Sequence, residues 1–253
     1  MNTKKITIGI ADCAVAAEVM FESTQRLCKE YLCGQNADFT VEITPDDIAF
    51  EREKSRAEDL AEGKPARALT DAQLEITALQ RKIAEKMFDY NTLVFHGSVV
   101  AVDGEAYLFT AKSGTGKSTH TALWRQIFGE RAVMVNDDKP FLRITQDGVT
   151  AYGSPWNGKH GLGSNIAAPL KGICILERGI ENSIQEIPAG EALFMLLQQS
   201  NRPMDKRKMP IYMELLDTLS RNVRFYRLKC NQLPEAARIS YEAMSGKSIG
   251  KTI

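Results

Sequence analysis

A glycine-bearing segment in the middle of the chain constrains the fold more than any other feature. Residues 111–118 read Ala-Lys-Ser-Gly-Thr-Gly-Lys-Ser. A predicted strand over 105–110 leads into this segment, and residues 118–128 favour a helix that Gly129 would end. A phosphate-binding loop lies between a strand and a helix, and its pattern is a small residue, four variable residues and then Gly-Lys-Ser. The sequence therefore predicts an α/β fold built around this loop.

The residue types of the loop suit the phosphates of a nucleotide. Glycines allow backbone N–H groups to turn inward around phosphate oxygens, and the N-terminus of the following helix carries a partial positive charge. We expect Lys117 to reach the terminal phosphates and Ser118 to ligate Mg²⁺, so ATP and Mg²⁺ are the predicted cofactors. A glycine turn with a solvated lysine is the alternative. The residues expected to contact the nucleotide are Ser113, Gly114, Thr115, Gly116, Lys117, Ser118 and Thr119.

Two adjacent carboxylates, Asp137 and Asp138, follow an apolar strand predicted over 132–135. An acidic residue at the end of such a strand is where a P-loop fold holds its Mg²⁺. Two carboxylates also permit a division of labour, in which one binds the metal and the other takes a proton from a hydroxyl. We expect Asp137 to be a metal ligand and both residues to be catalytic, and we leave open which one is the base. An Asp-Asp pair by itself is common in turns.

His96 lies within a strand predicted over 93–102 and directly precedes Gly97. A lone histidine in a strand is more often a hydrogen-bonded core residue than a catalytic one. A glycine in a strand, however, allows another group to approach the backbone closely. A turn at Asp103-Gly104 would pair this strand with the one that enters the phosphate loop. His96 is therefore a candidate catalytic residue.

A glycine-rich stretch over 153–163 has the composition of a mobile substrate loop, although plain surface loops are also rich in glycine, serine and asparagine. We expect Trp156 to close over a substrate and exclude water. The next basic surface is offered by Arg202 and by residues 206–208. The candidate substrate residues in the stretch are Trp156, Asn157, Lys159 and His160.

Composition excludes several classes of partner. Lys plus Arg and Asp plus Glu number 32 each, so no bulk charge favours nucleic acid or an anionic membrane. The five cysteines include no Cys-x-x-Cys pair, and we expect them to be reduced. The N-terminal residues contain no apolar signal segment, and no apolar run reaches the roughly 20 residues that a membrane span needs. We expect a cytoplasmic protein, and the sequence is compatible with a homo-oligomer.

The chain divides by character near residue 90. Residues 1–90 form an N-terminal segment without a catalytic signature, and residues 91–253 form the predicted P-loop domain with a mixed central sheet. In the first part we predict a strand over 5–10, a helix over 14–32, a strand over 38–44, a charged helix or arm over 45–68, and a helix that Thr70 and Gln73 cap. After the acidic pair we predict a hairpin over 141–152, strands over 170–177 and 223–228, and helices over 188–200, 205–220 and 234–244.

Taken in chain order, the histidine strand, the glycine loop, the acidic pair and the glycine-rich stretch resemble the HPr serine kinase/phosphorylase family. More broadly, they resemble the phosphoenolpyruvate-carboxykinase-like P-loop fold. That family has His-Gly on a strand, a hairpin into a Ser-Gly-x-Gly-Lys-Ser/Thr loop, and Asp-Asp after the next strand. The matching positions here are His96-Gly97, residues 113–118 and Asp137-Asp138. The resemblance implies a nucleotide site at the loop, a metal near Asp137, Asp138 or its neighbour as the base, and His96 beside the transferred phosphoryl group.

The chain departs from that family in two places. HPr kinases carry a metal-binding glutamate followed by Arg-Gly-x-Gly, whereas residues 157–163 hold Asn157 and no acid. Residues 1–90 also do not resemble the regulatory domain of those enzymes. We therefore expect a diverged, ATP-dependent kinase that phosphorylates a serine-type hydroxyl on a small molecule, peptide or protein other than HPr. The alternatives are a nucleotide-binding switch protein without kinase activity and a carboxykinase-like enzyme, although carboxykinases are much longer chains.

Overall fold

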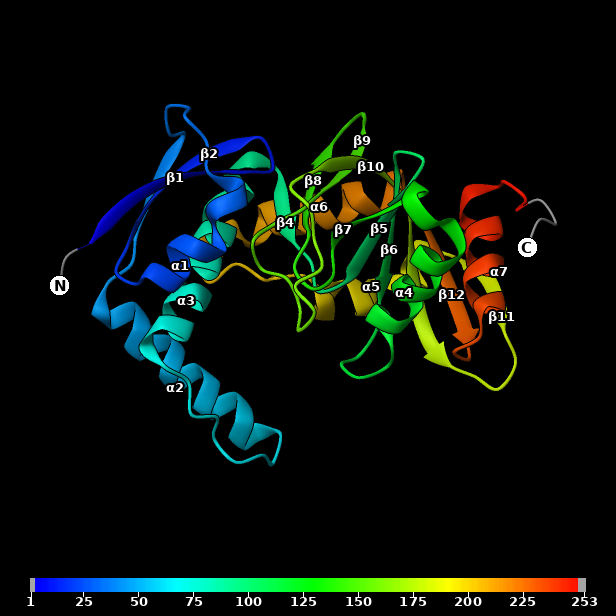
Figure 1. Cartoon of the computed structure of the whole chain (residues 1–253), viewed down its shortest axis with the longest axis horizontal. Coiled ribbons are helices and arrows are strands. Elements are labelled where there is room, and N and C mark those ends of the chain that lie inside the picture. The colour runs from blue at the N-terminus through cyan, green and yellow to red at the C-terminus, as the bar shows by residue number, and fades with distance from the viewer. Residues whose placement is uncertain (1–2, 250–253) are drawn as a thin grey trace. The chain divides into compact units, whose positions relative to one another are not determined.

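The computed structural model describes residues 3–249, and its chain divides into two compact units, Met1–Lys86 and Met87–Ile253 (Figure 1). Both units combine helices with a sheet. Among the described residues, no helix is both long enough and apolar enough to cross a membrane.

The first unit is a small α/β structure. Strands β1 (Lys4–Ile10) and β2 (Cys13–Val19) form an antiparallel hairpin, and β3 (Phe39–Glu42) pairs in parallel with β2. The helices of this unit are α1 (Glu22–Leu27), α2 (Pro45–Ala61) and α3 (Asp71–Met87). The predicted cap of α3 is present, because the Gln73 side chain accepts a hydrogen bond from the Thr70 N–H at 2.9 Å.

The helix predicted over 14–32 is wrong. Its first half is strand β2, and only the short helix α1 and a 3₁₀ turn over Lys29–Tyr31 follow. Ala11 and Asp12 both adopt positive φ, 47° and 60°, which gives a two-residue turn that folds the chain back on β1. The alanines of 13–19 suggested a helix, but pairing with β1 and β3 on both sides overrides that propensity.

The second unit contains, among the described residues, a nine-stranded mixed sheet. Its strands are β4 (Thr92–Val94), β5 (Ser98–Val102), β6 (Glu105–Thr110), β7 (Ala132–Asn136), β8 (Phe141–Thr145), β9 (Gly148–Tyr152), β10 (Ala167–Arg178), β11 (Ser183–Ile187) and β12 (Arg224–Cys230). The long strand β10 is the centre, since it pairs in parallel with both β6 and β12 and, at its start, in antiparallel with β9. The mixed α/β architecture predicted for this part of the chain is confirmed.

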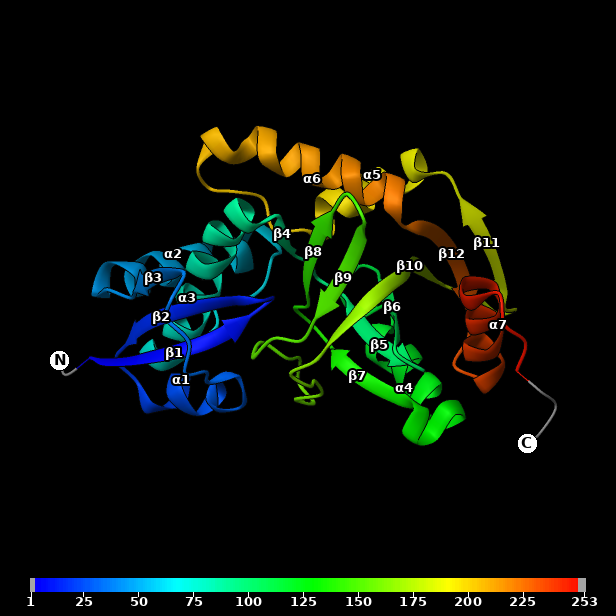
Figure 2. The same ribbon diagram turned by 90° about the horizontal axis from the view of Figure 1, so that it is seen from above.

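Helices cover both faces of this sheet (Figure 2). On one face, α4 (Lys117–Phe128) and α7 (Pro234–Ser245) bury an aromatic cluster around Trp124. On the other face, α5 (Ala189–Gln199) and α6 (Met209–Asn222) pack on an aliphatic cluster that includes Leu108 and Ile173. The two helical layers bury the central strands from both sides, and the loops at the strand ends project beyond them.

Two predicted elements of this unit differ from the structure, and one further strand was not predicted. The strand over 93–102 is broken at 95–97 into β4, which pairs with β8, and β5, which pairs with β6 and β7. The helix over 205–220 begins at Met209, after a 3₁₀ turn over Lys206–Lys208. Strand β11 was not predicted, and it pairs with β12 at the sheet edge.

Candidate functional site

The loop over 111–118 connects β6 to α4 through two glycines in unusual backbone conformations. Gly114 has φ 77° and Gly116 has φ 125°, which side chains with a Cβ rarely adopt. Nothing lies within 4 Å of a Cβ built at either position, so conformation and not space requires glycine there. Positive φ values turn successive N–H groups toward one side, which is the arrangement that receives phosphate oxygens.

Lys117 opens α4 and folds back over the loop. Its Nζ donates a hydrogen bond to the Ala111 carbonyl oxygen at 3.1 Å, and the residue is only 9% exposed. Burial lowers the pKa of Lys117, while the nearby Asp138 carboxylate acts to raise it. The ammonium is thus held inside the loop on a neutral carbonyl acceptor.

Asn136, at the end of β7, ties the acidic turn to the loop over 153–163. Its side chain is fully buried, and its Oδ1 accepts hydrogen bonds from the N–H groups of Asp138 at 2.8 Å and Lys139 at 2.6 Å. Its amide nitrogen donates to the carbonyl oxygen and the hydroxyl of Ser154, each at 3.1 Å. One amide side chain therefore fixes the backbone that carries both carboxylates.

Asp137 is 4% exposed, and its two carboxylate oxygens have different surroundings. Oδ1 accepts a hydrogen bond from the Gly158 N–H at 2.5 Å. Oδ2 is buried and has no hydrogen-bond partner among the described residues. A buried carboxylate oxygen without a partner is costly, and a cation is the partner that relieves it. Because Asp137 Oδ2 is a carboxylate oxygen without a hydrogen-bond partner within residues 3–249, it suits a hard divalent cation.

Asp138 and His96 lie together at the mouth of the site. His96 Nε2 is 3.3 Å from Asp138 Oδ1, and the two side chains are about one-third exposed, at 30% and 33%. Burial, and then the positive charges of Lys139 and Lys117, lower the pKa of His96 to about 3. The imidazole is thus neutral near pH 7, so its contact with Asp138 is not an ion pair. Burial also raises the pKa of Asp138.

The backbone around His96 explains why the strand breaks there. The His96 N–H donates to the Gln199 carbonyl oxygen at 2.6 Å, and the Gly97 N–H donates to the Asp138 carbonyl oxygen at 3.1 Å. A Cβ at Gly97 would lie 3.1 Å from the Phe109 carbonyl oxygen, so the predicted close approach at this glycine is present. His96 is therefore held between the end of α5, the acidic turn and β6.

The loop over 153–163 is anchored at its centre. Trp156 is 6% exposed and packs against Phe141 with ring centroids 6.0 Å apart, so its ring is part of the core in this structure. Lys159 and His160 are exposed. The Asn157 Oδ1 is buried without a partner among the described residues. The loop thus presents two basic side chains to solvent and keeps its aromatic ring inside.

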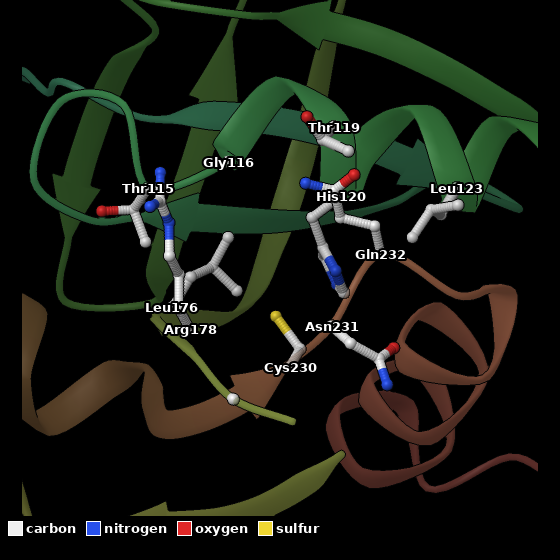
Figure 3. Close-up of a pocket in the computed structure, with 11 residues that line it drawn as sticks. Thr115, Gly116, Thr119, His120, Leu123, Leu176, Arg178, Cys230, Asn231 and Gln232 are labelled. Carbon is white, nitrogen blue, oxygen red and sulfur yellow. The ribbon is translucent and has the colours of Figure 1, made fainter. Parts of the chain in front are cut away.

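A pocket of about 230 Å³ adjoins the phosphate loop on the side of α4 that faces β10 and β12 (Figure 3). Arg178, at the end of β10, lines it and donates a hydrogen bond to the Gly114 carbonyl oxygen at 2.6 Å. The pocket residues are Thr115, Gly116, Thr119, His120, Leu123, Leu176, Arg178, Gly179, Cys230, Asn231 and Gln232.

The structure brings together the loop, the acidic pair and His96, and it adds residues that sequence reasoning missed. Asn136, Arg178 and Gln199 act through contacts with residues far away along the chain. Only Asn136 gave a local signal, because it directly precedes the acidic pair at the end of a strand. Arg202 and residues 206–208 lie on the segment between α5 and α6, where Arg202 donates to the Leu197 carbonyl oxygen and Lys208 pairs with Asp89.

Comparison with known proteins yields distant structural similarity only. No family model matches the sequence, and no curated protein matches it. Among solved structures, the Hpr(Ser) kinase/phosphatase from Coxiella burnetii is similar to 60% of this chain and 99% of its own, with 12% identity and a TM-score of 0.35.

Proposed function

We propose that this protein is an ATP-dependent kinase that transfers the γ-phosphoryl group to a hydroxyl-bearing acceptor. The observation that carries the proposal is the convergence of three groups in one unit: Lys117 inside a glycine loop, the buried Asp137, and Asp138 beside a neutral His96. Phosphoryl transfer depends on positioning and on charge stabilisation, and these groups supply both.

The loop residues Ser113 to Thr119 would bind the phosphates through their N–H groups, the N-terminus of α4 and Lys117. When the Lys117 Nζ moves from the Ala111 carbonyl oxygen to a phosphate, the ammonium exchanges a neutral acceptor for an anionic one. Arg178 steadies the loop from outside through the Gly114 carbonyl oxygen.

Ser118 and Asp137 would hold Mg²⁺. The buried Oδ2 of Asp137, which has no hydrogen-bond partner in the described part of the chain, fits this role. A Mg²⁺ ion held by these residues would neutralise negative charge that develops on the phosphates during transfer. The Gly158 N–H fixes the other oxygen of Asp137, so the carboxylate is already oriented.

Asp138 would serve as the base. The acceptor hydroxyl gives its proton to Asp138 as its oxygen bonds to the γ-phosphorus, and the bond from that phosphorus to the β–γ bridging oxygen breaks to leave ADP. A raised pKa makes Asp138 a better proton acceptor than a solvated carboxylate, and burial supplies that shift. The neutral His96 would orient Asp138 through the 3.3 Å contact and lie beside the transferred group.

The acceptor would meet the loop over 153–163, where Lys159 and His160 are exposed. Lys159 can offset charge on the transferred group or hold an anionic acceptor. Asn157 and Trp156 would shape the loop beneath it, since Trp156 is buried against Phe141. A serine-type alcohol on a small molecule or a peptide fits a carboxylate base better than a carboxylic acid does, because a carboxylic acid is already ionised near pH 7.

The test is transfer of labelled γ-phosphate from ATP-Mg²⁺ to free serine, related alcohols and small proteins. Label should appear on at least one hydroxyl compound, and Asp138→Asn should abolish the transfer. Lys159→Ala should impair acceptor use and leave ATP affinity nearly unchanged. Tight ATP-Mg²⁺ binding without transfer to any acceptor would instead favour a nucleotide-binding switch.

A further inference from the structure

The pocket beside the phosphate loop lies where three parallel strands end. Strands β6, β10 and β12 run in the same direction, and β10 and β12 end at the pocket residues Arg178 and Cys230. Strand β6 continues directly into the phosphate loop, whose residues Thr115 and Gly116 form the adjoining wall. Ligands of open α/β sheets bind outside the carboxyl ends of such strands.

The size and walls of the pocket suit a flat group that is part of a larger ligand. Its volume, about 230 Å³, is below the range of about 300–1,000 Å³ typical of pockets that enclose a whole ligand. Leu123 of α4 and Leu176 of β10 supply apolar surface. Gln232 is exposed at the rim and offers both a donor and an acceptor.

His120 adds a second, independent sign of a ligand. The residue is 2% exposed, and its Nε2 contacts the Ser240 hydroxyl at 3.0 Å, whereas its buried Nδ1 has no partner among the described residues. In Figure 3 the side chain points away from α4 toward the segment that carries Cys230 and Asn231.

We propose that this pocket binds the base and ribose of the nucleoside triphosphate, an inference that rests on the proposed function. The phosphates would lie on the adjoining loop, Leu123 and Leu176 would contact the faces of the base, and His120 and Gln232 would meet its polar edge. Arg178 belongs to both sites, because it lines the pocket and holds the Gly114 carbonyl oxygen. A nucleoside packed against Arg178 therefore also orders the phosphate loop.

Calorimetric titrations with ATP-Mg²⁺ and with tripolyphosphate-Mg²⁺ test this assignment. The wild-type protein should bind ATP roughly tenfold or more tightly than tripolyphosphate, which lacks the nucleoside. Leu123→Trp, which fills the pocket, should lower ATP affinity to that of tripolyphosphate and leave tripolyphosphate binding unchanged. Leu193→Trp is the matched control, since Leu193 is 41% exposed on α5 and lines no part of this pocket.

The outcomes separate this inference from the proposed function. If tripolyphosphate binds and Leu123→Trp binds ATP as tightly as the wild type, the pocket assignment is overturned while the phosphate site stands. If neither ligand binds the wild-type protein, both proposals fail.

Alkylation of Cys230 provides a measurement that needs no variant. Cys230 is half-buried in the pocket, and burial raises the pKa of its thiol, so alkylation should be slow. ATP-Mg²⁺ should slow it further, and tripolyphosphate should not. Cys33, which is also half-buried but lies in the first unit, is the internal control. Equal alkylation of Cys230 with and without saturating ATP would overturn the assignment.

Discussion

Replacement of Asn136 by alanine should destabilise the second unit strongly, although the side chain touches no predicted ligand. The change removes the Asn136 Oδ1, which accepts hydrogen bonds from the N–H groups of Asp138 and Lys139. Alanine offers no side-chain acceptor in its place. A fully buried donor left without a partner costs about 1–3 kcal/mol, and these two N–H groups are partly buried, so together they cost up to about 6 kcal/mol. That is a large fraction of the roughly 5–15 kcal/mol by which domains are stable.

Urea unfolding followed by tryptophan fluorescence measures this loss. Both tryptophans, Trp124 and Trp156, lie in the second unit, so the signal reports on that unit. Asn222→Ala is the matched control, because Asn222 is exposed on α6 and makes one amide contact, to the Thr218 carbonyl oxygen at 2.9 Å. It should cost less than about 0.5 kcal/mol. A loss below about 1 kcal/mol for Asn136→Ala would refute the argument that this side chain fixes the acidic turn.

Three further outcomes follow from the site and its surroundings. Asp137→Asn should weaken Mg²⁺-dependent ATP binding in calorimetry, whereas Asp138→Asn should bind ATP-Mg²⁺ normally and fail in transfer; equal behaviour of both variants and the wild type would make the pair a structural turn. Because burial lowers the pKa of His120 from 6.5 to about 3, the unfolded chain takes up a proton first as pH falls below 6.5. His120 should therefore make stability fall toward lower pH by about 1.4 kcal/mol per pH unit, and His96, whose pKa is lowered alike, adds its own share. In urea unfolding, His120→Gln should reduce the total slope by the His120 share only, whereas replacement of the exposed His160 by glutamine should not reduce it. Gly153→Ala should destabilise the second unit severely in the same assay, since the new Cβ would lie 1.9 Å from the Ser164 carbonyl oxygen. An unchanged urea midpoint would show that the backbone moves to make room for the methyl group.

The elements around the phosphate loop could be predicted from sequence because their signals are local. Asp103 and Gly104 have φ of 52° and 81°, as a two-residue hairpin turn needs, and Gly129 ends α4 with φ 54°. The residue preferences of turns and helix ends depend on only a few neighbouring residues, so the order of strand, loop and helix can be predicted from the sequence. The acidic pair at the end of β7 followed from the same logic.

The remaining features depend on contacts that the sequence does not display. The alanine-rich residues 13–19 suit a helix by propensity, yet two neighbouring strands hold them as β2. The break at His96 exists because its N–H bonds the Gln199 carbonyl oxygen, which belongs to the end of α5. Trp156 looked like a lid from its glycine-rich setting, but Phe141 provides a buried partner for its ring. In each case a distant residue decides the outcome.

The central claim is that Lys117 acts on the phosphates of ATP. Its most direct test is the rate of ADP formation from ATP-Mg²⁺ by Lys117→Ala and by Lys112→Ala, an exposed lysine in the same loop. Lys117→Ala should lower the rate by roughly a hundredfold or more while circular dichroism stays unchanged, because it removes the loop's buried cation. Lys112→Ala should stay within about twofold of the wild type. A rate for Lys117→Ala close to that of the wild-type protein would contradict the account.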